Sequence, residues 1–180
     1  MAPAATVEFK ATHVLTVRVS NESAATLRDK AAMEESASRV FRHSGIDIVW
    51  AECPPAPASC PEITGPAGLT NVLIRLMDAP DQPDRSLLGR ANHVNSSATI
   101  FYKRVCAMEK DSRWIVTRAQ ILGHAIAHEI GHLLLASDTH SLFGIMKADY
   151  DLKDMVILGQ GNLFFTAEEG QLLRSALGTK

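Results

Sequence analysis

The sequence lacks an apolar run long enough to cross a membrane. A transmembrane helix needs roughly 18 or more consecutive apolar residues. The longest candidate, residues 121–136, is interrupted by three histidines and a glutamate. The first residues, Met-Ala-Pro-Ala-Ala-Thr, also lack the basic segment and apolar stretch of a secretory signal. We therefore expect no membrane partner.

An excess of charge of either sign is missing as well. The 180 residues carry 18 Lys and Arg against 20 Asp and Glu, a formal net charge of −2, and the signs are interspersed. Binding to nucleic acid or to an anionic membrane surface usually depends on clustered positive charge. We expect neither partner. The length, the ordinary apolar content and the absence of internal repeats favour a single domain over residues 1–180. We expect this domain to be a monomer.

Cysteine is scarce, with three residues in the chain. Cys53 and Cys60 flank a short proline-rich loop, whereas Cys106 stands alone. Two interpretations are open: a Cys53–Cys60 disulfide in an exported protein, or three free thiols in a reducing compartment. We favour the disulfide, and with it a secreted or periplasmic location.

Periodicity predicts four strands and three helices. Alternating, β-branched stretches indicate strands, and apolar residues at helical spacing between capping signals indicate helices. Asn21 or Ser23 is expected to cap the first helix, and capping boxes are expected from Thr117 with Gln120 and from Thr166 with Glu169. The order is typical of an α/β or α+β fold, and we predict α+β. The predicted strands are 14–20, 46–50, 71–77 and 98–105; the helices are 23–43, 117–135 and 167–177; 78–90 and 137–150 are predicted loops.

The motif that carries chemistry is His128-Glu129-Ile130-Gly131-His132. Residues four apart share one face of a helix, so His128 and His132 can direct their imidazoles at one ion. Zn²⁺ accepts neutral imidazole nitrogens and favours four-coordinate sites. Glu129 follows the first ligand and can act as a general base on a water molecule. The helix is strongly apolar, so its polar residues need partners. A hydrogen-bonded polar cluster is the alternative to metal binding.

The segment from Ala127 to Leu135, followed by Gly144-Ile145-Met146, resembles the metzincin family of zinc peptidases. The resemblance implies a metzincin-like zincin fold. Its N-terminal subdomain, residues 1–132, would hold a twisted mixed sheet with a backing helix and the active-site helix. Its C-terminal subdomain, residues 133–180, would hold a terminal helix and a Met-turn that places Met146 beneath the metal. It also implies a third zinc ligand after the helix, and a protein or peptide substrate.

The chain departs from the family pattern His-Glu-x-x-His-x-x-Gly-x-x-His at two positions. Leu135 stands at the glycine and Asp138 at the last histidine, while the nearest histidine is His140. Either His140 binds the metal from a longer loop, or Asp138 binds it at the family position. We favour His140, so the predicted ligands are His128, His132 and His140. Leu135 in place of glycine suggests that the helix ends later than in the family.

Other polar residues receive smaller roles. His124 lies one turn before His128, and we interpret it as structural because a fourth protein ligand would block a catalytic zinc. Tyr150 is either a pocket wall or a group facing the developing oxyanion. The strand 98–105 is expected to be the sheet edge that binds extended peptides. Three histidines have no partners at ligand spacing and are interpreted as surface residues: His13, His43 and His93. Two glutamates are alternative third ligands of a different zincin class, although the capping box already accounts for the second: Glu168 and Glu169.

Three functions compete at this point. The leading hypothesis is a zinc-dependent endopeptidase with Glu129 as general base. The second is a non-catalytic, zinc-bound metzincin-like binding domain, against which the presence of Glu129 argues. The third is an amide hydrolase of the peptide deformylase type, which needs an upstream cysteine ligand. Cys106 lacks the sequence context for that role.

Overall fold

The computed structural model of the chain describes residues 13–53, 71–78, 87–113 and 115–178. These residues form five strands, five α-helices and one short 3₁₀ helix. In chain order the elements are β1 (His13–Glu22), α1 (Leu27–His43), β2 (Ile46–Cys53), β3 (Asn71–Met77), β4 (Gly89–Asn92), η2 (His93–Asn95), β5 (Ser97–Phe101), α2 (Tyr102–Asp111), α3 (Arg118–Leu135), α4 (Leu152–Gly159) and α5 (Ala167–Gly178).

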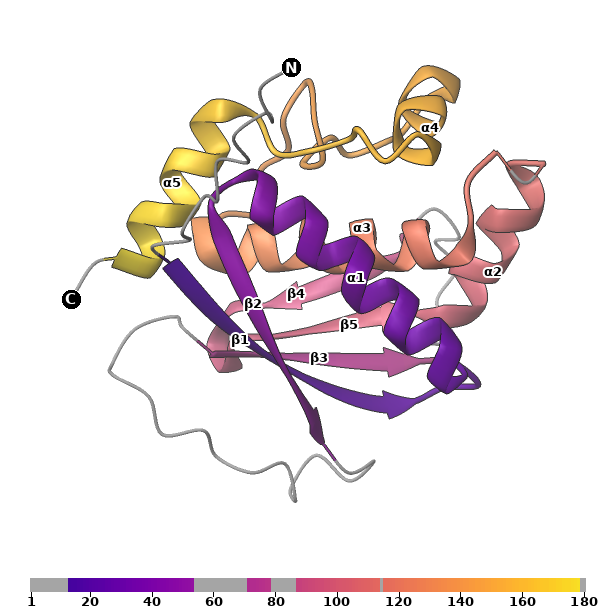
Figure 1. Cartoon of the computed structure of the whole chain (residues 1–180), viewed down its shortest axis with the longest axis horizontal. Coiled ribbons are helices and arrows are strands. Elements are labelled where there is room, and N and C mark those ends of the chain that lie inside the picture. Colours follow the sequence, from indigo (N-terminus) through magenta and orange to yellow (C-terminus); the bar gives the residue numbers. More distant parts are fainter. Residues whose placement is uncertain (1–12, 54–70, 79–86, 114, 179–180) are drawn as a thin grey trace, which may run out of the picture.

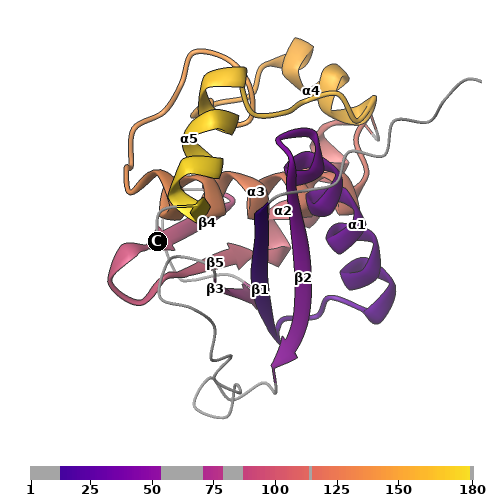
Figure 2. The same cartoon turned by 60° about the vertical axis from the view of Figure 1, so that its left-hand side comes forward.

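The strands build one twisted mixed sheet in the order β2-β1-β3-β5-β4 (Figures 1 and 2). The first four are parallel neighbours, and β4 runs antiparallel to β5 at the edge. The predicted α+β class and mixed sheet are confirmed. The predicted strand 71–77 coincides with β3, and β1 and β2 extend slightly beyond the predicted ranges.

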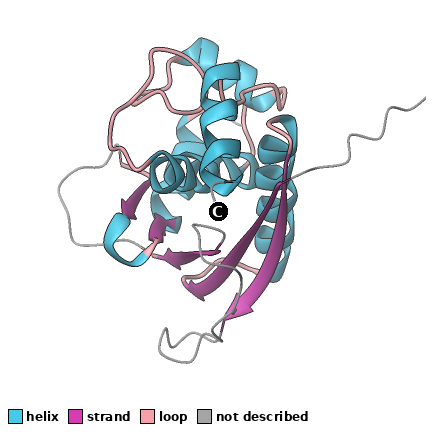
Figure 3. Cartoon of the chain, turned by 90° about the vertical axis from the view of Figure 1, so that its left-hand side faces the viewer, coloured by secondary structure: helices cyan, strands magenta, loops and turns pink. Residues whose placement is uncertain are grey.

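The sheet buries one face against the helices. Alternate residues of β1 and β3 are fully buried, as the two-residue period of a strand requires. Side chains between them carry polar groups, and Arg18 donates a hydrogen bond to Asn71 on the neighbouring strand at 2.9 Å. Figure 3 shows the helices gathered on one side of the sheet. The core-facing residues are Leu15, Val17, Val19, Val72, Ile74 and Leu76.

Helices α1 and α3 pack in direct contact on that face. A Cβ atom added to Gly123 of α3 would lie 2.5 Å from Cβ of Ser36 and 2.8 Å from the backbone nitrogen of Ala37, both on α1. Only glycine allows the two backbones to approach so closely. The contact holds α3, which carries the histidine motif, against the backing helix (Figure 1).

Helix α1 begins later than predicted. Asn21 and Ser23 do not cap it, because their side chains form a local turn in which Ser23 N–H donates to Asn21 Oδ1 at 3.1 Å. Thr26 is the N-cap, and it forms a capping box with Asp29. By contrast, the capping boxes predicted at Thr117 with Gln120 and at Thr166 with Glu169 are confirmed.

The predicted strand 98–105 is wrong beyond Phe101, where β5 ends and α2 begins. Tyr102 and Val105 favour a strand by residue type, but tertiary contacts select a helix. The Tyr102 hydroxyl donates to Asp29 at 2.9 Å and accepts from Arg118 at 3.0 Å. Arg118 also pairs with Glu109 of α2 at 2.9 Å.

The sheet edge was also assigned to the wrong strand. The strand β5 lies between β3 and β4, so the edge is β4, whose first residues fall in the predicted loop 78–90. Residues 79–86 of that loop lie outside the described residues. Helix α4 was not predicted, although Asp151 and Asp154 form a capping box at its start. None of the described helices has the length and apolar character of a bilayer span.

We predict that Gly123→Ala destabilises the protein by about 1–3 kcal/mol, because the new methyl group overpacks the α1–α3 contact. The free energy of unfolding from urea titration measures this loss. Gly170→Ala in α5 is the matched control, since its nearest neighbour is Ser44 Oγ at 3.2 Å and alanine favours a helix. Equal effects of the two substitutions would contradict the close-contact interpretation.

Candidate metal site and cleft

Helix α3 carries the histidine motif through the core. Apolar residues surround it on most sides, and Glu129 and His132 are both only 5% exposed. His128 and His132 project from successive turns, and their Nε2 atoms lie 3.0 Å apart. The predicted convergence of the two imidazoles is therefore present.

The hydrogen bonds of the two rings determine their tautomers. Nδ1 of His128 lies 2.7 Å from the carbonyl oxygen of Ile145, and Nδ1 of His132 lies 2.7 Å from that of Ser137. A carbonyl can only accept, so each Nδ1 carries the proton. In the neutral rings both Nε2 atoms then present lone pairs to each other. That arrangement is unfavourable unless a cation lies between them, and a backbone carbonyl on the second nitrogen is the usual partner of a metal-binding histidine.

Burial keeps both rings neutral. It lowers the pKa of His128 to about 4, although the hydrogen bond to the Ile145 carbonyl opposes this shift and the neighbouring His132 adds to it. Burial also lowers the pKa of His132. Neutral imidazole is the form that binds metal ions.

His140 completes the group from the loop after α3. One nitrogen from each of His128, His132 and His140 lies within 4.8 Å of the other two, and among the described residues this is the group that could hold a metal ion. The ring of His140 faces those of His128 and His132, with centroids 5.3 and 4.9 Å away. Three nitrogen ligands suit Zn²⁺ and leave its fourth position open.

Asp138, the competing third ligand, faces a different partner. Its Oδ1 lies 2.9 Å from Nε2 of His93, and this hydrogen bond lowers the pKa of Asp138. His93 is exposed, as predicted, and it is not part of the three-histidine group. The residues 93 and 138 meet because η2 and the loop after α3 are adjacent in space, which the sequence did not reveal.

The end of α3 is part of the site. The helix stops at Leu135, and Ala136 takes a left-handed conformation with φ of 49°. The predicted end of this helix at about Leu135 is confirmed, and no further helical residues follow, although Leu135 in place of glycine suggests a later end than in the family. Ser137 N–H donates to the His132 carbonyl at 3.2 Å and Ala136 N–H donates to the Leu133 carbonyl, which is a Schellman termination. The same turn presents the Ser137 carbonyl to the His132 ring.

Glu129 lies beside the three imidazoles. Burial raises its pKa to about 7, opposed by a hydrogen bond from the Ala91 backbone amide of β4. A carboxylate with a pKa near neutrality is well suited to exchange protons. Gly89 of β4 makes room for it, because a Cβ there would lie 2.8 Å from Glu129 Cγ. In the sequence the only signal of Gly89 is a glycine within the predicted loop 78–90, and that does not indicate a place beside Glu129.

A tight turn lies beneath the group. Gly144 has φ of 74°, and Lys147 N–H donates to the Gly144 carbonyl at 3.4 Å. Met146 is buried, and a Cβ added to Gly131 would lie 2.4 Å from its sulfur. Gly131, the fourth residue of the histidine motif, is therefore required for Met146 to pack under α3. We did not single out Gly131 from the sequence.

Tyr150 and His124 hold backbone carbonyls. The Tyr150 hydroxyl donates at 2.7 Å to the Ile145 carbonyl, the same oxygen that accepts from His128. Burial raises the pKa of Tyr150, so the phenol stays protonated. His124 lies 2.8 Å from the Gln120 carbonyl and 3.1 Å from that of Leu163, and it is not part of the three-histidine group. Its predicted structural role agrees with these contacts.

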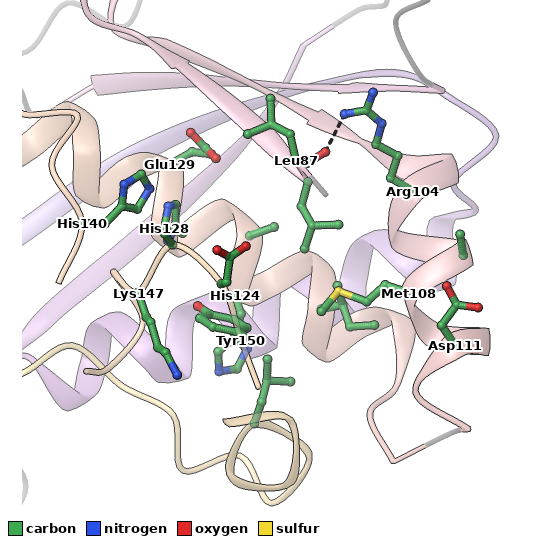
Figure 4. Close-up of a pocket in the computed structure, with 17 residues that line it drawn as sticks. Leu87, Arg104, Met108, Asp111, His124, His128, Glu129, His140, Lys147 and Tyr150 are labelled. Carbon is green, nitrogen blue, oxygen red and sulfur yellow. Dashed lines mark hydrogen bonds between the residues drawn. The ribbon is translucent and has the colours of Figure 1, made fainter. Parts of the chain in front are cut away.

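A cavity of about 610 Å³ opens beside the group. His128, His140, Glu129 and Tyr150 lie at one end, and Met108 lies toward the other (Figure 4). Volumes of this size are typical of ligand pockets. The wall combines apolar residues of α2, α3 and α4 and of the segment before β4 with four further charged residues: Leu87, Leu88, Met108, Ile121, Ala125 and Leu158; Arg104, Asp111, Lys147 and Asp149.

The cysteines separate into two kinds. Cys53 is disulfide-bonded and Cys106 is a free thiol, while Cys60 lies outside the described residues. Cys106 is not a member of the metal-binding group found among the described residues. The deformylase hypothesis, which needs a cysteine ligand, has no support from this geometry.

Comparison with solved structures identifies the fold. A zinc-dependent peptidase from Methanocorpusculum labreanum superposes with a TM-score of 0.56 at 14% identity, over 87% of this chain and 99% of that one. Archaemetzincin from Archaeoglobus fulgidus gives 0.53 at 14% identity, over 88% and 99%. Archaemetzincin from Methanopyrus kandleri gives 0.58 at 12%, over 92% and 96%. Neither a family model nor a curated protein sequence matches the chain.

These likenesses show that the chain has the fold of archaemetzincins, within the broader class of zincin-like folds. Coverage of nearly the whole length of each solved chain means that the likeness extends beyond the histidine helix to the sheet and the C-terminal segments. The predicted metzincin-like fold is thereby supported at the level of overall architecture.

We predict that His128→Ala and His140→Ala each weaken zinc binding by more than the ~10–100-fold typical of losing an outer partner. Titration against a chromophoric chelator measures the affinity. Asp138→Ala is the control and should bind zinc nearly as the unmodified protein does. Loss of zinc in Asp138→Ala with retention in His140→Ala would assign the third ligand to Asp138 instead.

Proposed function

We propose that this protein is a zinc-dependent endopeptidase of the archaemetzincin type, with His128, His132 and His140 as ligands and Glu129 as general base. The observation that carries the proposal is the buried Glu129 carboxylate, which lines the same cavity as His128 and His140, two of the three convergent imidazoles. A structural metal site has no need of such a carboxylate. The solved peptidases with this fold support the same class of activity.

Each residue then has a distinct task. Zinc held by His128, His132 and His140 would supply Lewis-acid chemistry toward water and the scissile carbonyl. Glu129 takes the proton of the attacking water and passes it to the leaving amine, for which a pKa of about 7 is appropriate. The carbonyls of Ile145 and Ser137 hold the two helix ligands in orientation. The turn at Gly144–Lys147 serves as the Met-turn, with Met146 packed under Gly131.

The substrate is a peptide or protein held in extended form. Strand β4 is the sheet edge, and it lies against Glu129, so a peptide added to β4 would pass the three imidazoles. The cavity lined by Glu129 would take a large side chain of the substrate, whose apolar part would lie against Met108, Ile121 and Leu158. A non-catalytic zinc-binding domain with the same architecture is the competing function.

We also propose that the protein acts as a monomer in a secreted or periplasmic setting. The disulfide at Cys53 supports an oxidising compartment. Mass measurement of the purified protein before and after reduction, with alkylation of free thiols, tests the disulfide under native conditions.

We predict that Glu129→Gln keeps bound zinc but lowers kcat/KM for peptide cleavage by about 10²–10⁴-fold, because the amide cannot accept the proton. Metal content by mass spectrometry and cleavage of casein or a quenched peptide provide the two readouts. Glu168→Gln, an exposed glutamate on α5, is the control and should cleave normally. A wild-type protein that binds zinc yet cleaves nothing would favour the non-catalytic binding domain.

The cavity leads to a specificity prediction. Met108→Glu places a carboxylate in the apolar wall, so cleavage next to large apolar residues should fall by about 10-fold or more relative to cleavage next to basic ones. A peptide library varied on both sides of the bond measures the ratio. Lys110→Glu, exposed on the same helix and outside the cavity wall, should leave the ratio unchanged. Identical profiles for both variants would exclude this cavity as the side-chain pocket.

A further inference from the structure

His140 differs from the other two histidines because no helix holds it. It lies in the loop between α3 and the turn at Gly144, and it is exposed. His128 and His132 have carbonyl partners on Nδ1 and a rigid helix behind them. A ligand on an exposed loop must instead be oriented by contacts of its neighbours.

The neighbouring residue, Ser141, supplies those contacts. Its backbone N–H donates to the Met146 carbonyl at 2.9 Å, and Ser141 forms an isolated parallel bridge with Lys147. Its hydroxyl donates to Oε1 of Glu169, which lies 28 residues further along the chain in α5. The loop is thus attached to the turn through its backbone and to α5 through a side chain.

Glu169 is a buried carboxylate with two separate partners. It is 7% exposed, and its Oε2 accepts from the Thr166 backbone N–H at 2.8 Å as part of the capping box of α5. Capping alone uses that oxygen and leaves Oε1 for Ser141. The preceding Glu168 is exposed, so the two acidic residues at the start of α5 have different surroundings.

The position of α5 allows this reach. The helix lies beside the C-terminal half of α3 (Figures 1 and 2), and the segment before it packs Phe165 against Gly131 within the histidine motif. The Ile145 N–H also donates to the Phe164 carbonyl at 3.0 Å. The start of α5 is therefore fixed relative to the two helix ligands. The hydrogen bond from Ser141 to Glu169 attaches the loop that carries His140 to this fixed point.

We propose that Glu169, acting through Ser141, is a positioning residue that orients His140 in the metal site. The inference rests on the proposed role of His140 as the third ligand. It does not depend on whether the protein cleaves peptides. Without the hydrogen bond between Ser141 and Glu169, the loop that carries His140 samples many conformations. Metal binding must then also order the loop, and the lost conformational entropy reduces the binding free energy. Loss of an outer partner of this kind typically costs 10–100-fold in metal affinity.

Ser141→Ala tests the proposal while leaving the α5 capping box intact. We expect zinc affinity to fall about 10-fold or more, and the visible absorption spectrum of the Co²⁺-substituted protein to change in position and intensity. That spectrum reports ligand number and geometry, which a general loss of stability does not alter in the folded protein. Ser141→Thr retains a hydroxyl and should restore both affinity and spectrum.

Two further variants separate positioning from helix capping. Thr166→Val removes the Oγ1 acceptor of the Glu169 N–H, so it should lower the melting temperature by roughly 2–4 °C while leaving zinc affinity and the Co²⁺ spectrum unchanged. Glu169→Gln keeps an oxygen acceptor for Ser141 and should bind zinc more tightly than Ser141→Ala. Glu168→Ala is the matched surface control.

Three results would overturn the inference: wild-type affinity and spectrum in Ser141→Ala, equal loss of affinity in Ser141→Ala and Thr166→Val, or a wild-type protein that binds neither zinc nor Co²⁺. Zinc affinity and the Co²⁺ spectrum are measured without any peptide cleavage. If they confirm the role of Glu169 in a protein that cleaves no peptide, only the proposed function is refuted. Active protein with a wild-type spectrum in Ser141→Ala would refute the role of Glu169 alone.

Discussion

The site depends on two neutral imidazoles, each of which donates its single N–H to a backbone carbonyl. His128 and His132 donate through Nδ1 to Ile145 and Ser137, so their Nε2 lone pairs converge at 3.0 Å. The carbonyls come from chain segments that follow α3, not from the helix itself. The helix must therefore end at Leu135 and the chain must return beneath it at Gly144. Much of the C-terminal segment is explained by the need to bring those two oxygens into place.

Small residues make the surroundings of α3 possible. Gly123 admits α1, Gly131 admits Met146, and Gly89 admits the Glu129 side chain. In each case a single Cβ would collide with a neighbour at less than 3.0 Å. Glycine is normally unfavourable in a helix interior, and here the cost at two positions of α3 is offset by close packing against α1 and against Met146. As a result, the polar histidine motif lies within the core, and each of its polar side chains has a hydrogen-bond partner or lines the cavity.

The cleft is assembled from elements that are distant in sequence. Its lining comes from Leu87 and Leu88 before β4, from helices α2, α3 and α4, and from residues 147–150 after Met146 (Figure 4). Strand propensity in the segment 98–105 pointed to an edge strand. The contacts of Tyr102 with Asp29 and Arg118 instead turn the chain into a helix. Local preference was outweighed there by a hydrogen-bond network spanning three helices, and the real edge strand is too short for a periodic signal.

The sequence by itself determined the helical histidine motif, its capping box and the strands near residues 14–20, 46–50 and 71–77, because each depends on a spacing of three or four residues or on alternation. For the third ligand it offered two alternatives, His140 and Asp138. Only the tertiary structure decided that Asp138 faces His93, that Gly89 and Gly131 shape the site, and that Glu169 reaches Ser141. These contacts join residues 15 to 45 positions apart, and the chain path between them is set by packing of the whole core. No local pattern encodes that path, which is why the histidine motif could be read from the sequence and the residues that support it could not.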